Sequence, residues 1–261
     1  MDLGLKGKNA AISGSSQGIG NAIAMALAAE GCNVAISGRN DERIEKAVAE
    51  AKAKGVKAVG IKCDFSKRAG CEKFVEDAVA GLGGLDILVN NVGGMIPGTL
   101  DGLTEEQWSM VLNTNLMAYV WTTRAAIPHL KKSKAGRILN VSGVSGTQLM
   151  PGALTTSIPN SAIIAFSKLM AADLGPHGIT VNNINPGMTA TDSWGPRAEA
   201  MAKVRNTTAD GVRQSMSAQT LLGRWAEPRE IGEAAAFLVS ERNSYMTGAT
   251  IEVDGGYTKY I

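Results

Sequence analysis

The residues best suited to chemistry in this 261-residue chain form a glycine-rich turn, Ser13-Gly14-Ser15-Ser16-Gln17-Gly18-Ile19-Gly20. A short apolar run precedes the turn and a helical run follows it, an order that offers backbone N–H groups and a positive helix end to a phosphate. Gly14 would permit the tight turn, Gly18 would let a pyrophosphate approach the backbone, and Gly20 would let the helix pack closely on the strand. We therefore predict a dinucleotide site whose contacts include Gly14, Ser16, Gln17, Gly18, Ile19 and Gly20.

Further candidate ligands of this dinucleotide follow the other apolar runs of the chain. Arg39 comes directly after the second run, where an acidic residue would bind a ribose 2′-hydroxyl and an arginine accommodates a 2′-phosphate. Arg39 therefore favours NADP(H) over NAD(H), the alternative being a solvated surface arginine. Asp64 is placed to accept a hydrogen bond from an adenine amino group. The remaining candidates stand in two turns and are Asn91, Gly93, Pro186, Gly187, Thr189 and Thr191.

The elements that must position these residues alternate along the chain. The pattern predicts strands at 10–12, 33–37, 56–62, 85–90, 137–141, 179–184 and 250–253, and helices at 21–30, 41–54, 67–82, 104–129, 160–174 and 228–239. Repeated strand–helix units with buried strands predict a parallel sheet covered on both faces, with ligands beyond the carboxyl ends of the strands. We expect a single α/β domain over 1–261, Rossmann-like and doubly wound. The long strand-free segment at about 188–222 is typical of a substrate lid.

Composition excludes several classes of partner. The net charge of +2 is too small to argue for nucleic acid or for an acidic membrane surface. No apolar run approaches the roughly 20 residues of a membrane span, and the N-terminus lacks a signal-peptide pattern. Three cysteines and two histidines without ligand spacing predict no metal site and free thiols in a reducing cytoplasm. We therefore expect a cytoplasmic protein that acts on a small molecule.

The motifs together resemble the short-chain dehydrogenase/reductase family, most closely its 3-oxoacyl carrier-protein reductase-like members. The resemblance covers nearly the whole chain and rests on Ser13-Gly14 with Gly18-Ile19-Gly20, Asp64, Asn90-Asn91-Val92-Gly93, Asn115, Lys168, Pro186-Gly187, Thr247-Gly248 and Val253-Asp254-Gly255-Gly256. It implies a seven-stranded parallel sheet, a nicotinamide cofactor and a homotetramer or homodimer. It also implies that Thr189 and Thr191 lie near the nicotinamide amide and the pyrophosphate.

The family's chemistry uses an asparagine, a serine, a tyrosine and a lysine four residues after the tyrosine. The resemblance assigns Asn115 as the asparagine that anchors a proton-relay water, and Lys168 as the lysine that also holds the nicotinamide ribose. The tyrosine position is then Ile164 and the serine position is Gly143, so two of the four groups are replaced. The interval from Gly143 to Ile164 is also longer than the dozen or so residues usual in the family.

Several residues could take the place of the missing groups. Ser145 lies two residues after Gly143, so its side chain should point to the same side of the strand, whereas Ser142 should point away from the site. Other candidates are Asn160 and Ser161 on the face of Lys168, the hydroxyls Thr155, Thr156 and Ser157, the tyrosines Tyr119, Tyr257 and Tyr260, and Lys168 itself.

We therefore expect an NADP(H)-dependent oxidoreductase that interconverts a ketone and a secondary alcohol with a non-standard proton donor. The catalytic candidates are Asn115, Lys168, Ser145 and Ser161. An isomerase or lyase on the same scaffold, or a cofactor-binding protein without turnover, are the alternatives.

Overall fold

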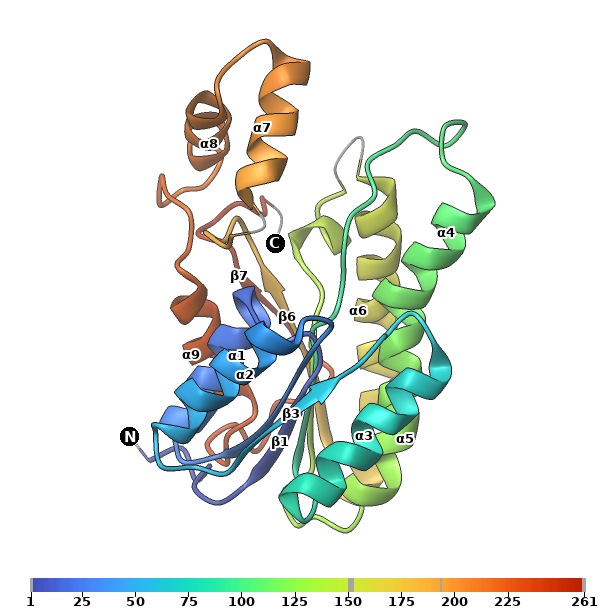
Figure 1. Cartoon of the computed structure of the whole chain (residues 1–261), viewed down its shortest axis with the longest axis vertical. Helices are drawn as coiled ribbons and strands as arrows, with labels where there is room; N and C mark the ends of the chain where they lie inside the picture. The colour runs from blue at the N-terminus through green and yellow to red at the C-terminus, as the bar shows by residue number, and fades with distance from the viewer. Residues whose placement is uncertain (1, 150–152, 193, 260–261) are drawn as a thin grey trace.

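One seven-stranded sheet organises the chain, as the computed structural model shows for residues 2–149, 153–192 and 194–259 (Figure 1). The strand order is β3-β2-β1-β4-β5-β6-β7 and every neighbouring pair is parallel. The strands are β1 (Asn9–Ile12), β2 (Asn33–Gly38), β3 (Ala58–Lys62), β4 (Ile87–Asn90), β5 (Arg137–Val141), β6 (Thr180–Pro186) and β7 (Thr250–Val253). The Rossmann-like doubly wound architecture is therefore confirmed.

Helices cover both faces of this sheet (Figure 1). They are α1 (Gly18–Ala29), α2 (Asp41–Lys52), α3 (Arg68–Leu82), α4 (Glu105–Leu112), α5 (Ala118–Leu130), α6 (Leu154–Leu174), α7 (Trp194–Arg205), α8 (Ala209–Ser217) and α9 (Pro228–Leu238). The sheet separates two hydrophobic clusters, because successive side chains of a strand point to opposite faces. Ala10 and Ile12 of β1 pack in the cluster with α1 and α9. Ala11 packs in the cluster with α3, α5 and α6.

The structure differs from the sequence-based expectation in two predicted helices and in the segment 188–222, which contains α7 and α8 although no helix is predicted there. The helix predicted over 104–129 contains a π-helical turn at Asn113–Met117 between α4 and α5, and a capping box of Thr104 and Gln107 begins it as expected. Helix α6 begins at Leu154, six residues before the predicted start at Asn160, and contains Pro159. Sequence reasoning treats an internal proline as a helix break, because it lacks the N–H that bonds the carbonyl four residues before it.

The strand order reverses between β1 and β4, because β1 leads outward through β2 to β3 whereas β4 leads to β5, β6 and β7. A crevice at the carboxyl ends of β1 and β4 is where doubly wound folds bind their ligands. Helices α7 and α8 stand beyond this edge of the sheet (Figure 1). Among the residues that the structure describes, no helix is long and apolar enough to cross a bilayer, and no cluster of metal-ligating side chains occurs.

Candidate active site

The glycine turn has the geometry that its sequence predicts. Gly14 and Gly18 have φ of +63° and +62°, values that residues with a Cβ rarely adopt. A Cβ on Gly20 would overlap the Gly14 carbonyl oxygen and Asn91 Nδ2, so only glycine lets α1 pack this closely. No side chain caps α1 at Gln17 and its first turn holds no acidic residue. The start of α1 therefore presents its N–H groups to an anion.

One side-chain amide and one hydroxyl connect this turn to the residues that follow β4. Asn91 donates from Nδ2 to the carbonyl oxygens of Ser13 (3.2 Å) and Gly14 (3.0 Å). Ser13 Oγ in turn accepts from the N–H groups of Asn91 (2.9 Å) and Val92 (3.2 Å). Asn91 thus lies beside the glycine turn, and its side chain connects the loop after β4 to the turn after β1.

Cationic and hydroxyl side chains surround the end of β2. Arg39 is exposed there, and a Cβ on Gly38 would overlap Ser16 Oγ, which places the Ser16 hydroxyl against the same strand end. Arg43 on the first turn of α2 donates to Gln17 Oε1 of the glycine turn. Sequence reasoning missed Arg43, although its position four residues after Arg39 was a signal.

Asp64 follows β3 at the same edge. The Ser66 hydroxyl and N–H donate to its Oδ1 at 2.7 and 3.0 Å, and these bonds, with the nearby positive charges of Lys67 and Arg39, hold the pKa of Asp64 below its usual range. Asp64 is therefore a fixed acceptor beside the β2 end, as an adenine-binding carboxylate requires.

The turn after β6 lies opposite the glycine turn. A Cβ on Gly187 would be 2.6 Å from Asp254 Cα, so glycine is required for this close approach. Thr189 is buried and donates to the Gly187 carbonyl oxygen at 3.1 Å. Thr191 lies next to Gly18, where an added Cβ would be 3.7 Å from Thr191 Cγ2. Thr191 thus lies beside the glycine turn, and Pro186, Gly187 and Thr189 precede it at the end of β6 and in the turn that follows.

The structure corrects the assignment of Lys168 to the site. A Cβ on Gly248 would be 3.2 Å from Lys168 Nζ, and the Gly248 N–H bonds the carbonyl of Val181, near the start of β6. The five residues from Val181 to Pro186 rise about 16 Å along the strand. Lys168 is exposed at the amino edge of the sheet, so it cannot reach a nicotinamide at the carboxyl edge.

The first two turns of α6 lie at the carboxyl edge instead. A Cβ on Gly143, after β5, would be 3.2 Å from Asn160 Nδ2. Counting about a dozen residues on from Gly143, the family's usual interval, reaches Thr156, and four residues further is Asn160. The overlong interval to Ile164 was the signal of this displacement. Thr156 and Asn160 therefore stand where the family has its tyrosine and lysine.

Amide and hydroxyl groups make up this part of the site. Asn160 Nδ2 donates to Ser145 Oγ at 2.9 Å, an arrangement that leaves the Ser145 hydroxyl proton for another acceptor. Ser161 Oγ donates to the Gly146 carbonyl at 2.8 Å, and Thr156 Oγ1 donates to the Ala153 carbonyl at 3.1 Å. Ser161 therefore stabilises the turn after Gly143, whereas the O–H group of Ser145 can still donate a hydrogen bond to a ligand.

Asn115 is buried in the π-helical turn and its side chain is fully engaged. Nδ2 donates to the carbonyls of Gly94 (2.6 Å) and Thr155 (3.2 Å), and Oδ1 accepts from the Gly94 N–H (2.9 Å). A Cβ on Gly93 would be 3.7 Å from the same Oδ1. Asn115 thus joins the loop after β4 to α6.

A buried polar cluster lies under Gly143. Ser142 Oγ, turned away from the site as strand alternation predicts, donates to Asn185 Oδ1 and accepts from Asn183 Nδ2 (2.9 Å). The Gly143 N–H donates to Asn185 Oδ1 at 3.3 Å, and Asn185 Nδ2 donates to Glu252 Oε1 at 2.9 Å. Burial raises the pKa of Glu252, whose Oε2 has no partner among the described residues. Sequence reasoning did not find this carboxyl.

The described tyrosines occupy three different environments. Tyr119 is buried, donates to the Val141 carbonyl at 2.7 Å, and has a pKa raised by burial. Tyr245 is exposed. Tyr257 is buried with Val144 and Met188 in a cluster that includes side chains of α7 and α8, and burial raises its pKa. Tyr260 lies outside the described residues.

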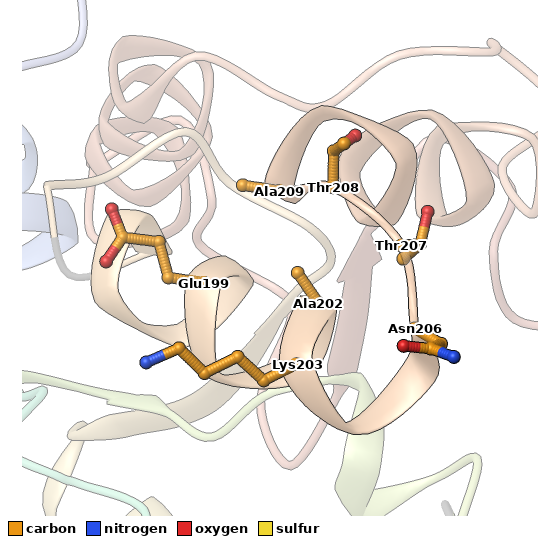
Figure 2. Close-up of a pocket in the computed structure, with 7 residues that line it drawn as sticks. All are labelled: Glu199, Ala202, Lys203, Asn206, Thr207, Thr208 and Ala209. Atoms are coloured by element: carbon orange, nitrogen blue, oxygen red, sulfur yellow. The ribbon is translucent and has the colours of Figure 1, made fainter.

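The segment 188–222 forms α7 and α8, and its methionines Met188 and Met216 pack into that cluster. A pocket of about 380 Å³ lies between the two helices, lined by Glu199, Ala202, Lys203, Asn206, Thr207, Thr208 and Ala209 (Figure 2). These residues all belong to α7, α8 and the turn between them, so this pocket is separate from the crevice beside the glycine turn.

The fold and the crevice define a dinucleotide-binding α/β protein. A family model described as enoyl-(acyl carrier protein) reductase matches residues 14–258. The 3-oxoacyl-[acyl-carrier-protein] reductase FabG of Staphylococcus epidermidis is 32% identical over 250 residues, which cover 95% of this chain and 98% of that protein. Oxidoreductase UcpA of Salmonella typhimurium is 36% identical over 256 residues, 97% of this chain and 95% of UcpA. The chain belongs to the short-chain dehydrogenase/reductase family of oxidoreductases.

Solved structures agree with this membership. L-sorbose reductase from Gluconobacter frateurii, complexed with NADPH and L-sorbose, is 32% identical with a TM-score of 0.95, covering 100% of both chains. A short-chain dehydrogenase from Burkholderia cenocepacia, in complex with NADP, is 32% identical with a TM-score of 0.87, covering 97% of this chain and 99% of the other.

Proposed function

We propose that this protein is an NADP(H)-dependent oxidoreductase that interconverts a ketone and a secondary alcohol without the family's tyrosine and lysine. The arrangement of the carboxyl edge carries the proposal: Asn91 and Thr191 lie beside the glycine turn, and Arg39 is exposed directly after β2 at the same edge of the sheet. The related structures that hold NADPH or NADP support the choice of cofactor.

The bound cofactor would supply or accept the hydride at C4 of its nicotinamide. Ser145, held by Asn160 Nδ2 at 2.9 Å, is then the donor that hydrogen-bonds the substrate's carbonyl oxygen. The oxygen takes its proton from water in reduction, because an aliphatic hydroxyl stays un-ionised near neutral pH. A positioned acid contributes about 10²–10⁴ in rate, so we expect slower turnover than in relatives that have one.

Turnover with a panel of ketones, followed by loss of NADPH absorbance, tests this proposal. Steady consumption with equal formation of alcohol is the expected result. The neutral character of Ser145, Thr156 and Asn160 favours one second candidate, a protein that binds the dinucleotide without turnover. Tight NADPH binding with no consumption across the panel would establish that candidate and reject the first.

Arg39 provides a test of the cofactor alone. Arg39→Ala should weaken NADPH binding by about 10- to 100-fold, because hydrogen bonds to charged groups contribute about 1.5–3 kcal/mol, and should leave NADH binding unchanged. Fluorescence titration with both cofactors measures the ratio. Arg68→Ala is the matched control, since Arg68 is another exposed arginine and pairs with Glu72 on α3. An unaltered NADPH/NADH ratio in Arg39→Ala would reject NADP(H) selectivity through this residue.

We also propose that 188–222 is a substrate lid and that the chain forms a homodimer or homotetramer. The shared cluster of Val144 and Met188 with α7 and α8 supports the lid, because it packs these helices against the loop after Gly143. An exposed apolar stripe on α6 supports self-association: Ile158, Ala165 and Leu169 recur on one helix face.

A further inference from the structure

The loop after β4 is held by two side chains that imitate a neighbouring strand. Asn115 donates to the Gly94 carbonyl at 2.6 Å and accepts from the Gly94 N–H at 2.9 Å. Thr155 Oγ1 donates to the Ile96 carbonyl at 2.7 Å and accepts from the Ile96 N–H at 3.3 Å. Alternate residues of the loop thus have both backbone groups satisfied by a single side chain, as a strand partner would satisfy them.

A further hydrogen bond connects Asn115 directly to the backbone of Thr155 on α6. Asn115 Nδ2 donates to the Thr155 carbonyl at 3.2 Å. In a regular helix that carbonyl would accept from the N–H four residues later, but residue 159 of α6 is proline and has no N–H. Pro159 therefore leaves the Thr155 carbonyl free for Asn115.

Burial and helix geometry make this arrangement rigid. Thr155 is 1% exposed and Asn115 is 5% exposed, so water does not compete for these bonds. Asn115 stands at the centre of the π-helical turn Asn113–Met117, a wider turn that often marks functional positions in helices. The loop is in turn continuous with Asn91, whose amide holds the Gly14 carbonyl of the glycine turn.

We propose that Thr155 is a positioning residue that extends the hold of Asn115 on the loop, so that the segment Gly93–Ile96 is clamped against α6 and the nicotinamide side of the cofactor site is shaped by it. Both N–H groups of Asn115 are donated within this clamp, and its oxygen accepts from the Gly94 N–H. Pro159 is the third component, because it keeps the Thr155 carbonyl available. The inference rests on the proposed binding of the nicotinamide dinucleotide.

The clamp predicts a specific series of variants at position 155. Thr155→Val removes the hydroxyl with little change of shape and should weaken NADPH binding by about three- to tenfold, with kcat changing less than the KM for NADPH. Thr155→Ser keeps the hydroxyl and should bind NADPH within about twofold of the wild type. Thr180→Val is the matched control, since the Thr180 hydroxyl is buried at the start of β6 with no hydrogen-bond partner in the described structure.

Pro159→Ala separates positioning from simple stabilisation. Alanine restores the N–H that bonds the Thr155 carbonyl and is the better helix former, so the melting temperature should rise. NADPH binding should nevertheless weaken by a few-fold, because Asn115 loses an acceptor. A residue that acts only through stability would move both quantities in the same direction.

Fluorescence titration with NADPH and thermal melting of the full chain decide the outcome. Equal affinities of wild type and folded Thr155→Val, or equal losses in Thr155→Val and Thr155→Ser, would overturn the clamp. A rise in both melting temperature and affinity in Pro159→Ala would also overturn it. A wild type that does not bind NADPH would instead reject the proposed function, and the clamp with it.

Discussion

At the scale of single residues, the turn after β5 and the start of α6 present neutral side chains to each other. Gly143 has φ of +144°, Thr156 and Asn160 replace two charged or ionisable positions of the family, and the one lysine of the motif lies at the opposite edge of the sheet. A serine restored at 143 would be strained there, because residues with a Cβ rarely adopt this φ. Restoring the family's chemistry would therefore require Thr156→Tyr and Asn160→Lys before any change at Gly143.

Ser145 and Lys168 should respond in opposite ways to substitution. Ser145→Ala removes the donor to the substrate oxygen and should lower kcat/KM for the ketone by about 10-fold or more. Lys168→Ala should leave kcat/KM within about twofold, because Lys168 is exposed and lies at the amino edge. Steady-state kinetics on both variants make the comparison. A collapse of activity in Lys168→Ala would return this lysine to the site.

At the scale of elements, neighbouring strands position the turn after β5. Asn185 of β6 pairs in register with Glu252 of β7, and its amide reaches from the Glu252 carboxyl to the Gly143 N–H. Side chains directly opposite on adjacent strands lie close enough for such bonds. The Glu252 carboxyl therefore helps to fix the position of Gly143 through Asn185, although β7 is the edge strand of the sheet.

The raised pKa of Glu252 predicts how this support depends on pH. Folding raises the pKa of the carboxyl through burial, so the folded state holds the proton more tightly and stability falls as pH rises from the unfolded pKa through the folded one. Glu252→Gln keeps the acceptor for Asn185 and removes the charge. Its melting temperature should exceed that of the wild type at neutral pH, and the difference should vanish at about pH 4. Thermal melts across that pH range measure it. A difference that does not vary with pH would contradict the assignment.

At the scale of the whole molecule, one chain leaves apolar side chains of α6 in contact with solvent. Leu169 is 64% exposed and Ile158 is 47% exposed. An apolar stripe on a helix is typical of contact with another helix, and a second copy of the same chain would cover it.

A charge placed on this stripe should dissociate the assembly. Leu169→Glu adds a carboxylate at an exposed position, so the single chain should remain folded while association weakens. Light scattering after gel filtration should show a shift from a multiple of 27.2 kDa to 27.2 kDa. Leu100→Glu, at an exposed leucine outside α6, controls for the same change in charge. A wild type already at 27.2 kDa would reject self-association.

The sequence by itself determined the order of strands and helices, the glycine turn and the residues after each strand, because hydrophobic periodicity and glycine conformation are local properties. Only the tertiary structure decided which residues meet. It showed that α6 begins before Pro159, since Asn115 from a distant turn satisfies the Thr155 carbonyl. It placed Thr156 and Asn160, rather than Ile164 and Lys168, near the carboxyl edge of the sheet. The start of α6 decides this, because each turn of the helix takes its side chains further from that edge. It also linked Glu252 to Gly143 through the amide of Asn185, although Glu252 and Gly143 are 109 residues apart.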